Sequence, residues 1–434
     1  MTFRTKFALI LFSAALAIYT VVGGWISTRA QQPANDPNAQ LRIFESVLQH
    51  IQNDYVDEPN MEKVRAGALR GLAYGLDPYS TYLTPDQVRQ FNEDGKSNQV
   101  GIGAELSQVA SYLYVIAPVK GSPADAAGVR AGDIIEYIDG KATRDISLYD
   151  AKQLLNGSAG SEVKLRILRA NTRPLTLTVK RSAFRASAAE AKMEAGRIGI
   201  LRVNSFAQGE AVDVRAHLQD LIRQGAQKMV LDLRGTAGGS LDEAVAVANL
   251  FIKEGTLAQT SGREAKTLKT FVADPRAAIF SGPVVALIDA GTAGAAEVVA
   301  SALLERNRGQ VVGEKSFGAG AEQQLFTLRA GDGLLLTTVK WASASGKPFL
   351  GEDRSHSGVT PSVEVKRPEL ADVIDPDSLT GNDDDQAAKS GASNEKHEVA
   401  PDANTARPSA EDLQMKKAVE LLRENKTVPL QKAA

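Results

Sequence analysis

The stretch Val284-Val-Ala-Leu-Ile288-Asp-Ala-Gly291-Thr-Ala-Gly294-Ala-Ala-Glu297 decides the fold of the central part of this chain. It opens with an apolar run, which predicts a buried strand, and continues through two glycines, which predict a tight turn. The residues that follow, Ala295–Glu305, have the apolar spacing of a helix. A buried strand that turns directly into a helix is the building unit of an α/β fold.

The same unit recurs before this stretch. Ile198–Val203 and Met229–Leu233 are apolar runs typical of buried strands, and Val212–Ile222 and Leu241–Phe251 have helical spacing. Leu334–Trp341 is a further predicted strand. The alternation predicts an α/β core with right-handed crossovers, in which a ligand or an active site belongs at the carboxyl ends of the strands.

A second glycine-rich segment, Gly313-Glu-Lys-Ser-Phe-Gly-Ala319-Gly320, follows this unit. Together, Gly291–Glu297 and Gly313–Gly320 resemble the active-site frame of the carboxyl-terminal processing peptidases, a family of serine peptidases. The resemblance implies that the nucleophile belongs at position 294 and a lysine general base at position 319. This chain has Gly294 and Ala319 there, whereas Gln323 matches the glutamine that orients the lysine.

The turn Asp232-Leu-Arg-Gly-Thr-Ala-Gly-Gly239 also follows a predicted strand and resembles a family motif. The family usually has Asn and Pro where this chain has Thr236 and Ala237. The resemblance implies an oxyanion hole, for which the candidate N–H donors are those of Gly238, Gly239 and Ala295. An ordinary glycine-rich turn remains the alternative for each segment.

Peptide hydrolysis by this route needs a hydroxyl group and a base within hydrogen-bond reach of it. Losing one such group from a serine protease costs on the order of a millionfold in turnover. We therefore predict a catalytically impaired member of the family. The alternative is an active serine-type endopeptidase that processes the C-termini of envelope proteins with a displaced dyad, Thr292 or Ser316 with Lys315.

Residues 98–182 have a pattern of short strands, and they resemble a bacterial PDZ domain. The segment opens with Gly101-Ile102-Gly103-Ala104, and a helix from Ser147 to about Leu155 follows later. An opening glycine loop exposes N–H groups that can bind a peptide carboxylate, and an exposed strand edge can accept a peptide. The expected ligands are peptide or protein C-termini. Glycines that merely form turns are the alternative.

Composition excludes several functions. A net charge of -2 gives no reason to expect a nucleic-acid partner, and the absence of Cys excludes disulfides and thiolate chemistry. The four histidines show no metal-ligand spacing, so neither a metal nor a cofactor is expected.

The first 31 residues contain an uncharged run, Phe7–Trp25, after Arg4 and Lys6. This pattern is typical of a signal peptide or of a membrane anchor, and the length of the run favours the anchor. Either interpretation places the rest of the chain in the periplasm of a bacterial cell envelope. The inner membrane is then a partner through this segment.

The predicted fold is mixed α/β: a processing-peptidase core related to crotonase and Clp-protease folds, with an inserted PDZ domain and helical ends. The predicted domains are an N-terminal helical segment (36–97), the PDZ domain (98–182), the core (183–368), a disordered linker (369–408) and a C-terminal helix with its tail (409–434). Ser409 and Asp412 form a predicted capping box for this helix. A third hypothesis makes the chain a regulatory subunit of an active paralogous peptidase.

Overall fold

The computed structural model describes residues 37–94, 100–144, 146–367 and 412–424, and the chain divides into two units, residues 1–68 and 69–434. The first unit contains α2 (Pro37–Asp54) and the start of α3 (Met61–Tyr74). The Asn60 side chain caps α3 by accepting the N–H of Lys63 at 3.0 Å. The predicted signal or anchor segment and the predicted linker lie outside the described residues.

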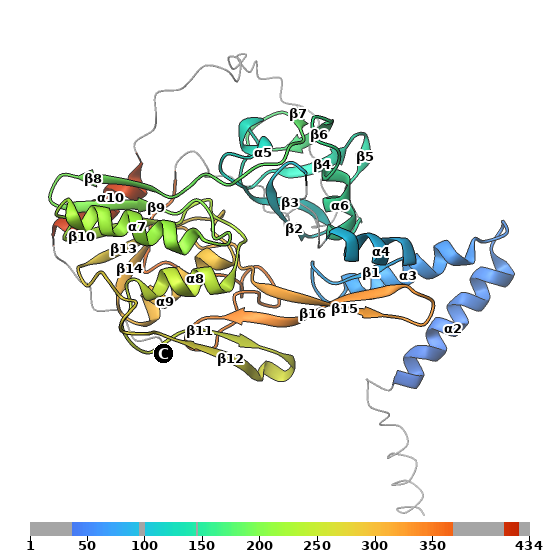
Figure 1. The fold of residues 1–434 in the computed structure, drawn as a ribbon. Helices are drawn as coiled ribbons and strands as arrows, with labels where there is room; N and C mark the ends of the chain where they lie inside the picture. The colour runs from blue at the N-terminus through green and yellow to red at the C-terminus, as the bar shows by residue number, and fades with distance from the viewer. Residues whose placement is uncertain (1–36, 95–99, 145, 368–411, 425–434) are drawn as a thin grey trace, which may run out of the picture. The chain divides into compact units, whose positions relative to one another are not determined.

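The second unit begins with the end of α3. A short strand, a short helix and a separate small sheet follow (Figure 1). The small sheet has the order β2-β3-β4-β6-β7, with β5 paired to β4. Its elements are β2 (Ala104–Val109), β3 (Tyr112–Pro118), α5 (Pro123–Ala126), β4 (Ile134–Ile138), β5 (Lys141–Ala142), α6 (Leu148–Leu155), β6 (Glu162–Leu168) and β7 (Leu175–Lys180). Ser147 caps α6, as predicted, and β2 is an edge strand.

The core contains a six-stranded sheet of order β17-β14-β13-β10-β9-β8. All neighbouring pairs are parallel except β8 with β9. Its strands are β8 (Glu190–Glu194), β9 (Ile198–Arg202), β10 (Lys228–Asp232), β13 (Val284–Ile288), β14 (Gly309–Gly313) and β17 (Val363–Glu364). The mixed α/β prediction is therefore confirmed.

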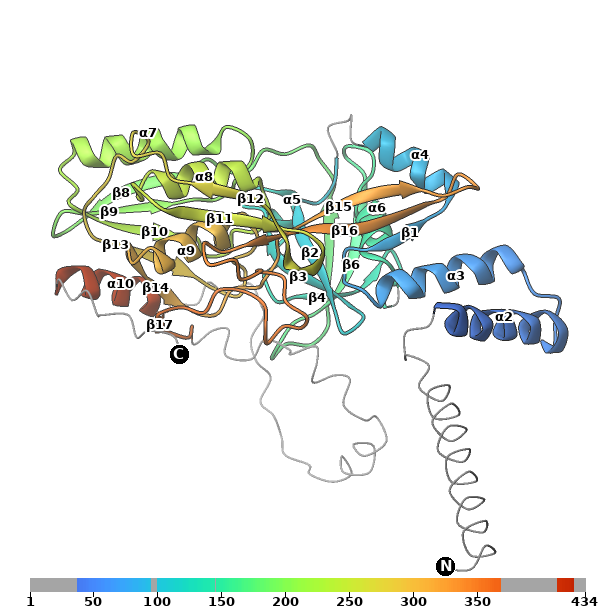
Figure 2. The same cartoon turned by 90° about the horizontal axis from the view of Figure 1, so that it is seen from below.

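Helices cover both faces of this sheet. On one face, α7 (Glu210–Arg223), α8 (Leu241–Asn249) and α9 (Ala295–Glu305) enclose the largest apolar cluster. On the other face, α10 (Leu413–Arg423) packs Ala418, Leu421 and Leu422 against the strands (Figure 2). Asp412 is the N-cap of α10, because its carboxylate accepts the N–H of Met415 at 3.0 Å. This corrects the predicted capping box, whose Ser409 lies outside the described residues.

A second, five-stranded sheet lies beside the core helices and runs β1-β16-β11-β12, with β15 paired to β16. Its strands are β1 (Thr81–Leu83), β11 (Thr256–Ser261), β12 (Thr267–Val272), β15 (Ala321–Thr327) and β16 (Gly333–Ala342). The short helices α4 (Pro85–Asp94) and η1 (Arg263–Ala265) accompany it. The segment that follows Asp77 thus contributes the strand β1 to this second sheet.

Candidate active site

Gly294 occupies the sharp turn between β13 and α9. Its backbone has φ 62° and ψ −114°, which side-chain-bearing residues rarely adopt. A strained strand-to-helix turn of this kind presents the nucleophile in α/β-hydrolases. The atoms nearest to a Cβ built on Gly294 belong to Gly238, at 3.7 Å, which is ordinary contact. The turn therefore has room for a nucleophile that the chain lacks.

Ala319, the other predicted site position, is half-buried and packs against an apolar cluster that includes Tyr114, Ala293 and Phe317. Gln323 lies on β15, where its Nε2 donates a hydrogen bond to Thr337 Oγ1 at 3.3 Å. A methyl group cannot accept a proton, so the base position is chemically empty while its neighbours are in place.

The buried carboxylate of Glu297 joins the two site positions. Its Oε2 accepts the N–H of Gly294 at 2.8 Å and that of Ala319 at 2.9 Å. Its Oε1 accepts the N–H of Gly318 at 2.8 Å and the hydroxyl of Ser316. Because Glu297 Oε2 accepts both N–H groups, the backbone nitrogens of Gly294 and Ala319 lie within two hydrogen-bond lengths of each other.

Two of the candidate oxyanion donors adjoin the turn at Gly294, because Gly238 lies against it and Ala295 follows it. Gly238 and Gly239 have φ of 75° and 90°, and they lie between β10 and the start of α8. Ala295 is the first residue of α9, where the helix dipole favours a negative charge. Within the described residues, the N–H groups of Gly238, Gly239 and Ala295 have no hydrogen-bond acceptor. They are free to bind an oxyanion.

The residues of the displaced dyad have other contacts. Thr292 Oγ1 is buried and donates to Leu233 O at 3.0 Å. Ser316 Oγ donates to Glu297 and accepts the N–H of Val359 at 2.7 Å. Lys315 Nζ donates to Ser355 O at 2.7 Å, and burial lowers its pKa. No described contact joins this amine to either hydroxyl, so the geometry does not favour the displaced dyad.

The loop Gly101–Ala104 lies at the start of the edge strand β2. Its carbonyls face inward: Ile102 O accepts from Ala124 N at 2.7 Å, and Gly103 O accepts from Val119 N at 2.9 Å. Among the described residues, the N–H groups of Ile102 and Gly103 have no acceptor. The loop thus presents free donors beside an unpaired strand edge, as a carboxylate-binding loop requires.

Two comparisons with known proteins decide the family. Residues 197–365 match the model of peptidase family S41, and residues 114–169 match a PDZ domain. The carboxy-terminal processing protease CtpA of Bacillus subtilis (strain 168) is 30% identical over 397 residues, which cover 91% of this chain and 83% of that protein. The chain belongs to the carboxyl-terminal processing peptidase family.

Other members of this family are similarly related. A carboxy-terminal-processing protease of Bartonella bacilliformis is 30% identical over 389 residues, which cover 88% of each chain. The solved photosystem II D1 C-terminal processing protease has a TM-score of 0.62 and 27% identity, over 76% of this chain and 88% of that one. The predicted family is therefore confirmed. In the described part of this family member, no helix is long and apolar enough to cross a bilayer.

Two side chains that the sequence did not point to enter the candidate site of this processing-peptidase homologue. The Glu105 carboxylate, on β2, packs against Gly238, so that a Cβ built on Gly238 would lie 2.7 Å from Glu105 Oε1. Tyr79 lies beside Ser107, and burial, together with the charges of Glu105 and Glu297, raises its pKa to about 12. A phenol with this pKa stays protonated at neutral pH, so Tyr79 does not supply the missing base.

Glu297 should make stability depend on pH. Burial raises the pKa of Glu297 from 4.5 to about 7, although the hydrogen bonds from Ser316 and three N–H groups lower it. A raised carboxyl pKa stabilises the fold fully below pH 4.5, and this contribution is lost as the pH rises towards 7. We expect the free energy of unfolding to fall by about 3 kcal/mol more in the natural protein than in Glu297→Gln over this range. Urea unfolding at several pH values measures both profiles, and parallel profiles would contradict the assignment.

Proposed function

We propose that this processing-peptidase homologue binds peptide or protein C-termini through its PDZ domain and is catalytically impaired. One observation carries the proposal: the frame around Gly294 and Ala319 is organised, while both reacting side chains are absent. Hydrolysis needs a nucleophilic hydroxyl that is activated by a base. Neither Lys315 nor Tyr79 stands in for that base, because the amine binds distant carbonyls and the phenol stays protonated.

The Glu105 carboxylate gives a second reason for impaired catalysis. It lies against Gly238, one of the candidate oxyanion donors. An oxyanion hole stabilises a developing negative charge, and a fixed negative charge beside it opposes that stabilisation. In this arrangement the site therefore disfavours the transition state of peptide hydrolysis even before the missing dyad is considered.

The proposed location is the bacterial cell envelope. The apolar run Phe7–Trp25 after two basic residues supports export through a signal peptide or retention by an anchor in the inner membrane. The proposed partners are then the C-termini of envelope proteins.

The PDZ loop offers a direct test of binding. A Cβ at Gly103 would lie 2.4 Å from Ser122 Cβ and 2.6 Å from the Phe184 ring, so Gly103→Ala must displace the loop and its free N–H groups. We expect this variant, or amidation of the peptide C-terminus, to weaken binding of a labelled peptide by about tenfold or more, because charge-assisted hydrogen bonds are lost. Fluorescence anisotropy with the full-length protein measures the dissociation constant.

Gly140→Ala is the matched control. Gly140 also has a positive φ, 78°, but a Cβ there would meet no atom within 4 Å. It therefore introduces the same kind of backbone strain in the same domain without displacing the loop. Equal binding of the free and amidated peptides by the natural protein would overturn the proposed binding mode.

A further inference from the structure

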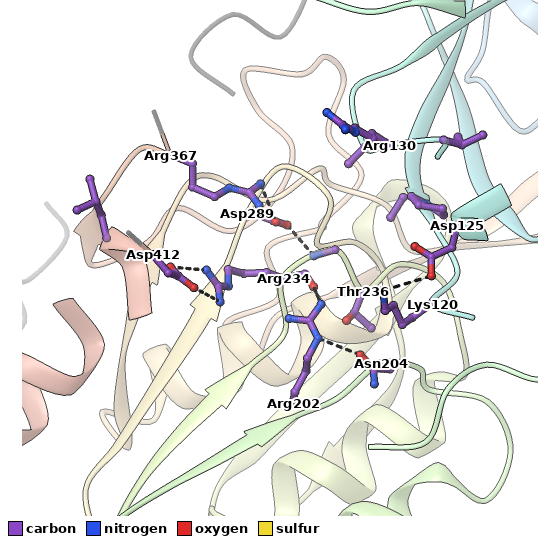
Figure 3. A pocket seen from close by; sticks show the side chains of 16 residues that line it. Lys120, Asp125, Arg130, Arg202, Asn204, Arg234, Thr236, Asp289, Arg367 and Asp412 are labelled. Carbon is purple, nitrogen blue, oxygen red and sulfur yellow. Dashed lines mark hydrogen bonds and ion pairs between the residues drawn. The ribbon is translucent and has the colours of Figure 1, made fainter. Parts of the chain in front are cut away.

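A hollow of about 610 Å³ lies where the PDZ domain meets the carboxyl ends of the core strands (Figure 3). The family resemblance assigns it no role. Its lining includes five basic residues and three acidic ones. The basic residues are Lys120, Arg130, Arg202, Arg234 and Arg367, and we call this site the arginine hollow.

Each acidic group of the arginine hollow already has an internal basic partner. Asp412 binds Arg234 through both carboxylate oxygens, each at 2.9 Å. Asp289 accepts the N–H groups of Gly235 and Gly291, each at 2.9 Å, and pairs with Arg367. Asp125 accepts the N–H of Gly121 and pairs with Lys120 at 3.3 Å. These carboxylates hold the wall together and leave little capacity to bind a cation.

Arg234 uses all of its side-chain N–H donors on neighbouring side chains, whereas three other basic residues of the hollow keep unused donors. The Nε of Arg367 is buried without a hydrogen-bond acceptor in the described part of the chain, since the nearest carboxylate oxygen, of Glu314, is 3.8 Å away. The Arg130 guanidinium has no ion-pair partner among residues 37–94, 100–144, 146–367 and 412–424. Arg202 uses one hydrogen of each nitrogen, on Asn204, Asp232 and the carbonyl of Arg234, so each terminal nitrogen keeps a second one. Spare N–H donors beside carboxylates that are already paired with basic groups favour an anion.

The position of the hollow indicates which anion. A smaller hollow of about 330 Å³ reaches Ala237 and Gly239, next to the candidate oxyanion donors. The two hollows share Ala117, Pro118, Asn204 and Gly235, so they adjoin. A peptide that passes Gly239 would continue over this shared wall towards the arginines. Arginine is also the side chain best suited to bind a carboxylate through paired hydrogen bonds.

We propose that the arginine hollow binds a carboxylate of a peptide that lies across the Gly238–Gly239 loop. This inference rests on the proposed peptide-binding function and deepens it, because it makes carboxylate-bearing peptides the ligand class. The carboxylate belongs either to an acidic side chain or to the peptide C-terminus. The hollow is separate from the Gly101–Ala104 loop, so a longer peptide segment would contact both.

Three labelled peptides of equal length separate these sources: one with glutamates and a free C-terminus, one with glutamates and an amidated C-terminus, and one with glutamines and a free C-terminus. Fluorescence anisotropy compares the full-length natural protein with Lys120→Gln/Arg130→Gln and with Arg367→Gln. We expect each variant to raise the dissociation constant about tenfold or more. A loss seen with both glutamate peptides identifies side-chain carboxylates, and a loss seen with both free C-termini identifies the terminal one.

Arg223→Gln is the matched control, because Arg223 is an exposed arginine on α7 that pairs with Asp220 outside the hollow. Its binding should equal that of the natural protein. If both hollow variants bind all three peptides as the natural protein does, the inference is overturned. Gly103→Ala separates this failure from that of the proposed function: it weakens binding if the PDZ loop acts, whatever the hollow does.

Discussion

Gly294→Ser combined with Ala319→Lys should convert this protein into a measurable peptidase. We expect turnover of an unfolded protein such as casein to rise about a thousandfold or more above the background of the natural chain, because a serine protease without its reacting groups loses on the order of a millionfold. Each single substitution should remain within about tenfold of that background, since a nucleophile and its base act as a unit.

The geometry of the turn supports this expectation. A serine Cβ at position 294 has ordinary contacts at 3.7 Å, and its cost is the backbone strain, about 1–3 kcal/mol. A lysine at position 319 would start from apolar surroundings, the cluster that contains Tyr114 and Phe317. Desolvation there lowers the pKa of an amine towards neutrality. In the described part of the chain the side-chain oxygen of Gln323 accepts no hydrogen bond, so it remains available to orient that amine.

Casein cleavage and labelling by a fluorophosphonate probe measure the restored activity. Gly294→Ala/Ala319→Lys is the matched control, because it has the same backbone strain and the same lysine but no hydroxyl group. It should show neither turnover nor labelling. If the Ser/Lys double variant is folded and silent, and remains silent when Glu105→Ala removes the carboxylate beside Gly238, the frame is not a latent active site.

How much of this site follows from the sequence depends on the range of the interactions. The strand Val284–Ile288 and the helix Ala295–Glu305 have the predicted bounds, because an apolar run and its glycine boundary are local signals. Strand β12 was not predicted, since its only buried residue is Phe271 and it therefore lacks the alternation of a half-buried strand. The same holds for β15, whose side chains are all at least partly exposed.

Contacts between segments that are far apart in the sequence could not be predicted from such local signals. Glu297 could be placed in the frame by its position, but its hydrogen bonds to Ser316, Gly318 and Ala319 connect segments about twenty residues apart. The approach of Glu105 to Gly238 depends on how the PDZ domain packs on the core. Periodicity and spacing describe single elements, and these contacts form only when separate elements pack.

Glu297→Ala should be the most destabilising single substitution that the site offers. It leaves the N–H groups of Gly294, Gly318 and Ala319 and the Ser316 hydroxyl without their acceptor in a buried setting. Each unpaired buried donor costs about 1–3 kcal/mol, and removing the buried carboxyl group, which is mostly protonated at pH 5, offsets part of the total. We expect the free energy of unfolding by urea to fall by about 4 kcal/mol at pH 5.

Glu305→Ala is the matched control for this effect, because Glu305 ends the same helix and accepts its hydrogen bonds from exposed Ser345, at 2.7 Å from the N–H and 3.0 Å from the hydroxyl. Removing Glu305 should cost less than about 1 kcal/mol.

Glu297→Ala also tests the frame around positions 294 and 319. When it is added to the Ser/Lys double variant, the restored turnover should vanish even in the fraction of the protein that remains folded. The reason is that the carboxylate is what holds positions 294 and 319 together, and a displacement of about 1 Å between reacting groups can cost a hundredfold in rate. Full stability together with undiminished turnover would mean that packing, and not this carboxylate, aligns the two positions.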